Sequence, residues 1–426
     1  MSQTASAPPP PAVQPGPAGP VASRAHAPER DVTEDTPRLL NRLQVVAVTV
    51  CLVFAVLAAV VQVLAFRADG RAADNTEQVV RVQEVRSLLL RADAIATTGF
   101  LVGGLEPADQ RAAYDAAIDD VLGLLTDAAD AQPADRAVLG DLNRAVSAYT
   151  TAVAQARDLN RQQLVIAIAY LNQAGSILRE QALPAVDALV SANSARATDE
   201  MGGHHPSWLL GLALLALVGL WWTNRALAVR FHRRLNVGLL AAAGVVAVVA
   251  ILGAANAGAR ASSNADTRDG PYRTAVDEAA ARSAANDAKA AEALGLVNRG
   301  SGAVYEENAF DPAAAVVEEN ASPITLNAWR QYVEQHDVVR QRDDRGSWDR
   351  AVELATSEAD DAPSALLAEV DATAAQVTEE NAALATDGFS GGGALTLGLA
   401  LLTLLGGLAA AGAATWGVNQ RRREYA

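Results

Sequence analysis

The residue types that do chemistry are scarce in this chain and stand at unhelpful spacings. His204 and His205 are neighbours, so on a helix their side chains would point about 100° apart, and no third metal ligand follows at helical spacing. For this pair we favour packing at a helix interface, with metal binding or pH sensing as the alternative. His336 lies on an apolar stripe and is expected in a core or a groove. Cys51 is the only cysteine, so neither an intramolecular disulfide nor a cysteine zinc site can form.

Sequence motifs of enzymes are also missing. The sequence contains no phosphate-binding G-x-x-x-x-G-K-[ST], no G-x-S-x-G nucleophile and no H-E-x-x-H metal motif. Glycines 391–393 precede an apolar run instead of following a strand, so we do not expect a phosphate-binding loop there. The segments expected inside the cell are too short for a kinase, a cyclase or a methyl-accepting hairpin. We therefore expect a protein that is not an enzyme and that uses no metal or cofactor.

The net charge of −15 is unevenly distributed along the chain. Residues 67–206 hold twelve arginines and nineteen acids, and residues 255–390 hold eleven basic residues and twenty-five acids. The basic clusters flank apolar runs instead, which disfavours nucleic acid as a partner because phosphate binding requires a basic face. Lys289 is the only lysine, and we attribute this to nucleotide bias in the source genome.

Four apolar runs separate the polar segments, at residues 44–66, 207–223, 235–255 and 392–414. A helix rises ~1.5 Å per residue, so each run is long enough, or nearly so, to cross a hydrocarbon layer of ~30 Å. Arginines before the first run, in the 224–234 link and after the last run place the link and both termini in the cytoplasm by the positive-inside rule. The runs lack ionisable side chains away from their ends, which disfavours transport.

The runs also contain small residues four positions apart. Such pairs let helices pack closely in lipid, although Ala-rich spans contain them by chance as well. The pairs are Gly238 with Ala242, Gly406 with Ala410, and Gly407 with Ala411.

The polar segments have the apolar periodicity of helices. Residues 67–206 show four stretches with apolar side chains at 3–4-residue spacing, which is typical of an antiparallel four-helix bundle. Residues 256–391 are less regular, with one stripe from Trp329 to Val339 and another from Val370 to Leu384. We predict an all-α membrane protein with four transmembrane helices and two tandem extracytoplasmic domains that resemble four-helix bundles. Its segments are a disordered Pro-rich cytoplasmic tail (1–43), spans at 44–66, 207–223, 235–255 and 392–414, bundles at 67–206 and 256–391, a basic cytoplasmic link (224–234) and a basic cytoplasmic C-terminus (415–426).

The two halves of the chain show weak internal similarity. Aligning residues 92–104 with residues 288–300 at an offset of 196 pairs Gly99 with Gly295 and Gly104 with Gly300. Together with the repeated order of span, helices and span, this predicts a tandem duplication.

Candidate binding residues lie at the ends of the predicted helices. The small residues Ala92, Ala96, Gly99 and Gly103 favour close helix packing over a small pocket, with Asp93 as an ordinary flanking charge. Loops near Gly103–Glu106 and Arg157–Arg161 are expected at the tip farthest from the membrane, and the second tip is expected to be acidic. The candidate docking residues are Gly103, Gly104, Glu106, Arg157, Asp158, Arg161, Glu306, Glu307, Asp360 and Asp361.

Three stretches carry a family resemblance. Residues 91–118, 131–162 and 169–190 resemble the actinobacterial four-span membrane proteins of the GlnX type. The resemblance is strongest over the first outward domain and extends through the order of the spans and the Pro-rich tail. It implies an extracytoplasmic lipoprotein partner that binds glutamine, glutamate or aspartate, and a soluble protein kinase G inside the cell. It carries no contact residues onto this chain.

Our working hypothesis is therefore a non-enzymatic transmembrane relay. A liganded binding protein would dock on the bundle tips and change how the cytoplasmic segments meet a Ser/Thr kinase, through helix shifts of ~1–2 Å. Such a relay requires a ligand-dependent affinity, because a partner with equal affinity for both states shifts nothing. Two alternatives stay open: a direct small-molecule sensor of chemoreceptor type, and an envelope scaffold without signalling. A homodimer is also left open.

Overall fold

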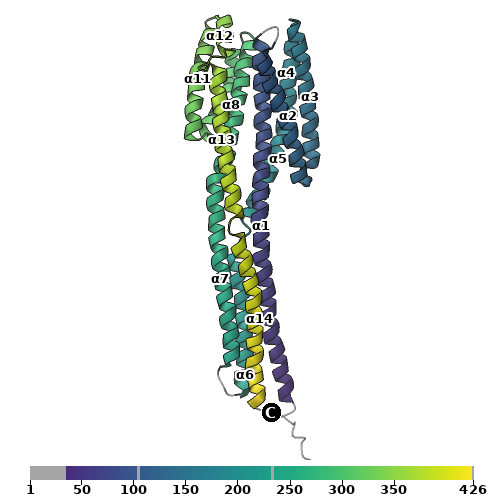
Figure 1. Cartoon of the computed structure of the whole chain (residues 1–426), viewed down its shortest axis with the longest axis vertical. Helices are drawn as coiled ribbons and strands as arrows, with labels where there is room; N and C mark the ends of the chain where they lie inside the picture. Colours follow the sequence, from purple (N-terminus) through teal and green to yellow (C-terminus); the bar gives the residue numbers. More distant parts are fainter. Residues whose placement is uncertain (1–34, 103–105, 232–234, 425–426) are drawn as a thin grey trace, which may run out of the picture.

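The computed structural model describes residues 35–102, 106–231 and 235–424 and contains only helices and their connections over these ranges. The molecule is elongated, with a narrow four-helix part at one end and two wider helical bundles at the other (Figure 1). The all-α prediction is confirmed. Of the predicted disordered tail at 1–43, residues 1–34 lie outside the described residues, as do the arginines at 233–234. Residues 35–43 belong to a helix instead, because the first membrane helix already begins at Asp35.

Four long helical columns run along the molecule, and each is apolar enough over part of its length to cross a membrane. The first column is one unbroken helix of 67 residues. The second and third columns each contain a π-helical segment, and the second and fourth columns each have a short break. The first column is α1 (Asp35–Leu101), and the second comprises α4 (Ala167–Ile177), η2 (Leu178–Ala182), α5 (Leu183–Met201) and α6 (Pro206–Phe231). The third column comprises α7 (Val237–Thr267), η3 (Arg268–Tyr272) and α8 (Arg273–Val297). The fourth column comprises α13 (Pro363–Ser390) and α14 (Gly393–Glu424).

Prolines accompany all three π-helical segments of the described residues. Pro184 follows η2, Pro271 lies inside η3, and Pro312 follows η4 (Glu306–Phe310). Proline lacks an N–H and its ring clashes with the carbonyl four residues earlier, so the preceding turn widens to a longer hydrogen-bond register. The helices therefore continue past each of these prolines without a sharp stop.

Bundle 1 consists of the distal half of α1, α2 (Ala108–Ala131), η1 (Pro133–Asp135), α3 (Arg136–Arg161) and α4–η2–α5. Its buried core is aliphatic apart from Tyr114 and Tyr149, and the side chains of Leu89, Val121, Leu142, Tyr149 and Leu178 are each fully covered. Pro107 is the N-cap residue of α2, and Pro133 is the first residue of η1. The apolar spacing of the fourth stretch extends back to Leu164 and predicts that this residue is helical, but Leu164 lies in the turn before α4 and is 45% exposed.

Bundle 2 consists of α8, α9 (Gly302–Tyr305), η4, α10 (Asp311–Asn320), α11 (Pro323–Asp344), α12 (Trp348–Ala355) and α13. The predicted stripe Trp329, Tyr332, His336 and Val339 is buried. The second predicted stripe is wrong at Leu384, which is 59% exposed, because the buried face of α13 passes through Ala385 and Phe389.

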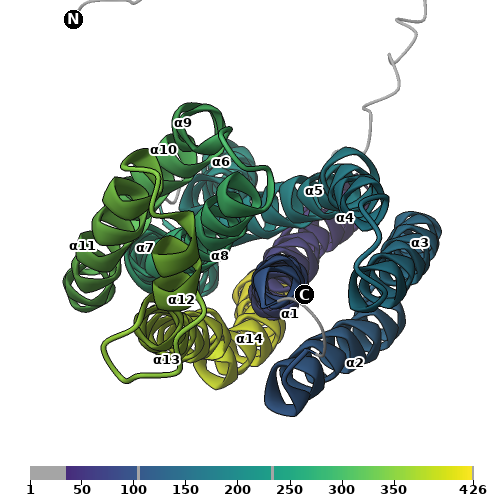
Figure 2. The same ribbon diagram turned by 90° about the horizontal axis from the view of Figure 1, so that it is seen from above.

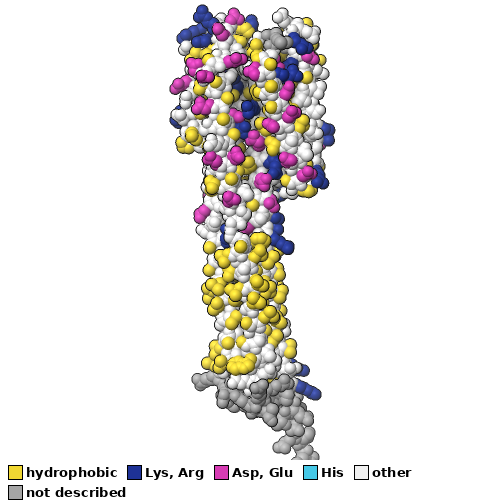
Figure 3. All heavy atoms as spheres, viewed as in Figure 1, with side chains coloured by type: hydrophobic (Ala, Val, Ile, Leu, Met, Phe, Trp, Pro, Cys, Tyr) yellow, Lys and Arg dark blue, Asp and Glu magenta, His cyan; other side chains and the backbone are white. Residues whose placement is uncertain are grey.

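The four membrane helices α1, α6, α7 and α14 form the narrow part, whose surface is a belt of apolar side chains (Figure 3). The predicted small residues lie at close helix contacts. Gly238 touches the backbone of α14 at Ala413, and Gly407 touches Ala55 on α1. A Cβ atom on Gly406 would lie 2.9 Å from the side chain of Val249 on α7. The close-packing interpretation of these pairs is confirmed.

Candidate functional site

All four columns meet at one carboxylate immediately outside the predicted spans. Asp69 on α1 lies 2.9 Å from Nε2 of His204, accepts a hydrogen bond from Nδ2 of Asn264 at 2.9 Å, and lies 3.3 Å from Arg260. Arg260 also donates to the backbone carbonyl of Phe389 at 2.7 Å. Asp69 is 2% exposed, so these contacts are shielded from water. We call this cluster of Asp69, His204, Arg260, Asn264 and Phe389 the junction.

Glycines bring the chain close to the junction at both helix breaks. A Cβ atom on Gly203 would lie 2.5 Å from the Cβ of Ala68, between α5 and α6. Gly392 has a φ of +80° between α13 and α14, a conformation that glycine adopts without strain. His204 is the buried interface residue that we favoured, whereas His205 is exposed and packs on Trp208 with ring centroids 5.2 Å apart.

The two bundles meet along α1 and α8, a contact that we call the seam. Figure 2 shows α1 between the other helices of bundle 1 and the helices of bundle 2. The hydroxyls of Ser87 and Ser283, which are 196 residues apart, lie 2.8 Å from each other. Arg282 on α8 pairs with Glu84 on α1 and, at 2.9 Å, with Asp371 on α13. The seam is therefore polar although it is buried.

Two further ion pairs start from equivalent positions on α1 and α8. The charges are exchanged, because the residue on α1 is basic and the residue on α8 is acidic. Arg91 on α1 pairs with Asp371 at 3.3 Å, and Asp287 on α8 pairs with Arg179 at 2.7 Å. Arg91 and Asp287 are separated by the same 196 positions as the two serines. This arrangement agrees with the repeat offset, and the tandem duplication itself stays a prediction.

Asp93 is not the flanking surface charge that we predicted. It is 1% exposed, and its carboxylate accepts from the Tyr149 hydroxyl at 3.3 Å and from Arg179 at 3.1 Å. Burial raises the pKa of Asp93, and the Arg179 guanidinium offsets this only in part. The prediction failed because this face of α1 meets both α3 and η2, which periodicity alone does not reveal.

Bundle 2 contains a second buried charge cluster. Lys289 pairs with Glu292 at 2.5 Å, and Glu292 accepts from Nδ1 of His336 at 2.7 Å. Glu306 lies 3.1 Å from the other ring nitrogen and 3.3 Å from Arg340. Burial alone would lower the pKa of His336, but the two carboxylates outweigh it and raise this pKa to about 9. Burial would raise the pKa of Glu292, but Lys289 and His336 outweigh it and hold it at about 2.

The predicted docking residues of bundle 1 come together only in part. Glu106 and Arg157 pair with each other at 2.9 Å and are largely covered, whereas Asp158 and Arg161 form an exposed pair at 3.0 Å. Gly103 and Gly104 lie outside the described residues. A Cβ atom on Gly99 would lie 2.9 Å from Oε1 of Glu106.

The small residues of α1 therefore make room for a side chain instead of only allowing close packing. Ala96 and Gly99 line a cavity of about 160 Å³ at the tip, together with Glu106 and Arg157. The preference for close packing over a small pocket is thus corrected at this end of the helix.

The predicted docking residues of bundle 2 also divide into a buried, paired residue and exposed residues. Glu306 belongs to the buried cluster around His336 and is engaged on both sides. Glu307, Asp360 and Asp361 are exposed. The described residues contain no group of three or more His, Cys, Asp or Glu side chains that could hold a metal ion.

Sequence reasoning missed an apolar surface at the far end of bundle 1. The turn between α3 and α4 exposes Leu164, Val165 and Ile166, with Val165 at 85%. A cavity of about 290 Å³ joins this turn to Val297 and Trp348 of bundle 2. The signal was an apolar triplet directly after the polar run 160–163, where Gln163 takes a φ of +56°. We call Leu164, Val165 and Ile166 the apical triplet.

Comparison with known proteins concerns bundle 1. Bundle 1 matches the family model of an actinobacterial sensor domain. The match to that family model covers residues 68–202, from the junction on α1 to the end of α5. It supports an actinobacterial sensor protein with a sensing or signalling role, and the four membrane-capable helices make the protein a multi-pass membrane protein. The chain matches none of the curated proteins and none of the solved structures.

Proposed function

We propose that this protein is a non-enzymatic transmembrane signal relay of the GlnX type. It senses extracellular glutamate, glutamine or aspartate through a solute-binding lipoprotein that docks on the bundle tips, and it signals to a cytoplasmic Ser/Thr kinase of the protein kinase G type. Both termini and the 224–234 link face the cytoplasm in this proposal, and the bundles face outward. The observation that carries it is the apical triplet, an exposed apolar surface at the far end of a sensor domain.

The triplet supports docking because contiguous exposed apolar side chains are uncommon on a polar domain unless a partner covers them. Its distance from the apolar belt favours a protein partner over lipid as the group that covers it. Val165 and Ile166 are 85% and 56% exposed, so a partner would remove more apolar area there than at other positions of bundle 1.

A docking event at this end has a direct route to the membrane. Bundle 1 shares α1 with the membrane part, and α1 has no break between its distal end and Asp35. The junction links α1 to the other three columns through Asp69, Arg260 and their partners. A shift of ~1–2 Å, typical of signalling helices, would therefore reach all four spans.

The test is purification of the tagged full-length protein from gently solubilised native membranes, with and without added glutamate or aspartate. An amino-acid-binding lipoprotein should co-purify in a ligand-dependent way, and Val165→Glu should abolish its capture. Leu122→Glu is the matched control, because Leu122 is 41% exposed on α2, outside the apical triplet. Capture of no binding protein, or equal capture with and without the amino acid, overturns the relay.

One observation favours a second candidate, a direct small-molecule sensor. Two cavities of about 380 and 390 Å³ flank the seam, and each is lined by both bundles. A ligand there would act on the spacing of the bundles without any docked protein. The third possibility, an envelope scaffold, predicts partners that do not respond to nutrients.

A further inference from the structure

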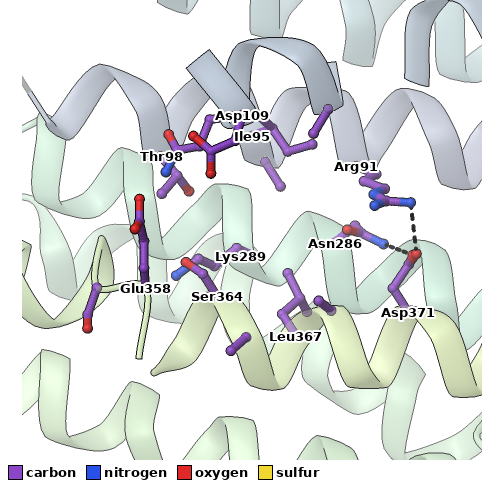
Figure 4. Close-up of a pocket in the computed structure, with 16 residues that line it drawn as sticks. Arg91, Ile95, Thr98, Asp109, Asn286, Lys289, Glu358, Ser364, Leu367 and Asp371 are labelled. Carbon is purple, nitrogen blue, oxygen red and sulfur yellow. Dashed lines mark hydrogen bonds and ion pairs between the residues drawn. The ribbon is translucent and has the colours of Figure 1, made fainter. Parts of the chain in front are cut away.

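The cavity of about 380 Å³ has one wall from each bundle (Figure 4). Thr98 on α1 and Asp109 on α2 lie on one wall, and Ser364 and Leu367 on α13 lie on the other. Glu358, from the connection between α12 and α13, extends toward the wall that carries Thr98. The volume suits a small metabolite.

The two cations of this cavity are already neutralised. Arg91 pairs with Asp371 at 3.3 Å, and Asp371 also accepts from Asn286 at 3.0 Å (Figure 4). Lys289 pairs with Glu292 at 2.5 Å. An anionic ligand would have to compete with these buried carboxylates, which disfavours anions.

The groups of this cavity that remain unsatisfied can all accept a hydrogen bond. Thr98 is 6% exposed, and its Oγ1 has no hydrogen-bond partner among the residues that the structure describes. The same holds for Oε1 of Gln110, another lining residue. Asp109 and Glu358 form no ion pair within the described part of the chain. A buried acceptor without a partner destabilises the structure, and a donor on a ligand would remove this penalty.

We propose that this cavity binds a small organic amine in its ammonium form. The ammonium donates to Thr98 and Gln110 and is attracted by Asp109 and Glu358, while a short aliphatic body packs on Ile95 and Leu367. The negative charge of the surrounding bundles raises the local concentration of cations. The proposal gives a ligand class to the direct-sensor candidate and rests on it, and it does not involve the lipoprotein.

Binding would connect the bundles across the seam. The ligand would contact α1 and α2 on one side and α13 with its preceding connection on the other, so it would favour the arrangement in which these walls are close. α1 and α13 both lead to the junction. The proposed ligand therefore acts on the same helices as a docked partner would.

The test is calorimetric titration of the full-length protein in lipid nanodiscs with 1,4-diaminobutane, butylamine and succinate. Both amines should bind and succinate should not. Thr98→Val removes the hydroxyl while keeping the shape and should weaken amine binding about ten-fold, the effect of one lost buried hydrogen bond. Glu358→Gln, at an exposed position, should weaken binding several-fold, and less so at high salt.

Asp119→Asn is the control, because Asp119 is exposed on α2, ten residues beyond Asp109, and does not line the cavity. The affinity of the Asp119→Asn variant for both amines should equal that of the unchanged protein. The proposal is overturned if neither amine binds, if succinate binds as well as the amines, or if Thr98→Val and Glu358→Gln both leave the affinity unchanged. No lipoprotein is present in the titration, so these outcomes leave the docking proposal untouched.

Discussion

At the scale of single residues, the buried charges of the bundles are the main departure from an ordinary helical core. Burying an ion is costly unless a partner and further hydrogen bonds compensate. His336 is 0% exposed and stacks on Phe310 with ring centroids 3.6 Å apart. Its charge is held by Glu292 on α8 and Glu306 on η4, so its protonation is tied to the packing of three elements.

This arrangement predicts a pH dependence of stability. The pKa of His336 is about 9 in the folded protein against an ordinary value of 6.5, so its contribution is fully present below pH 6.5 and is lost as the pH rises through 9. The other charged groups of the cluster are Lys289 on α8 and Arg340 on α11. Thermal unfolding of the full-length protein between pH 6 and pH 10 should show falling stability over this window, by up to about 3 kcal/mol.

His336→Gln is the reference for that profile. The variant should be less stable than the unchanged protein at pH 6. Between pH 6.5 and pH 9, its stability should fall much less with pH than that of the unchanged protein. If the two proteins show parallel profiles over this window, His336 is not charged in the folded protein.

Residue types alone predicted the apolar half of the core but not its charges. The stripe from Trp329 to Val339 follows from spacing, because one helix face decides which side chains are buried. Asp93 and Asp69 were not recognised, since their partners lie on helices 50 or more positions away. A lone carboxylate on a helix looks like a solvated charge until the neighbouring helix is known.

At the scale of elements, the membrane helices depend on a few positions without a side chain. Gly407 on α14 faces Ala55 on α1 so closely that a Cβ atom would collide with it. Gly398, on the same helix, has no atom within 4 Å of its ideal Cβ position. These two glycines therefore provide a matched comparison for helix packing in lipid.

Gly407→Leu should separate α14 from α1 and lower the thermal stability of the detergent-solubilised protein, because overpacking typically costs about 1–3 kcal/mol. Gly398→Leu should change stability little, since its side chain would point into open space. Unfolding temperatures of the two variants, measured in parallel, check this. Equal unfolding temperatures would show that the contact between α14 and α1 does not determine the thermal stability of the protein.

The sequence predicts the long helices, but it does not predict the short helix or the π-helical segments. The four columns and the caps at Pro107 and Pro133 follow from apolar length and proline chemistry. The short α12 and the three π-helical segments did not, because an added residue in a turn leaves the average spacing nearly unchanged. Leu384 was misplaced because spacing alone allowed a stripe one position away from the buried face of α13, which passes through Thr378 and Ala385.

At the scale of the whole molecule, the seam decides whether the bundles act as one body. Ser87 and Ser283 meet at 2.8 Å in the middle of it, close enough for cysteines at these positions to form a disulfide. The native Cys51 is buried in the membrane part, so its replacement by alanine leaves a cysteine-free background.

In that background, Ser87→Cys combined with Ser283→Cys should form an intramolecular disulfide in native membranes. Tryptic digestion after Arg86 and Arg282 would release the linked peptides for mass spectrometry. Each single variant is a control, and so is Ser147→Cys with Ser283→Cys, since Ser147 is exposed on α3. Absence of the linked peptides under oxidising conditions would mean that α1 and α8 do not meet here in the membrane-embedded protein.

The position of the junction along α1 gives the molecule the proportions of a balanced lever. Asp69 is 34 residues from Asp35 and 32 residues from Leu101, or ~51 Å and ~48 Å at the helical rise. If α1 tilts as a rod about this fulcrum, a displacement at the sensing end reappears at the other end with nearly the same amplitude and the opposite direction. A push that closes the bundles would then spread the ends of the spans that lie farthest from the bundles, and the mechanical advantage would be close to one.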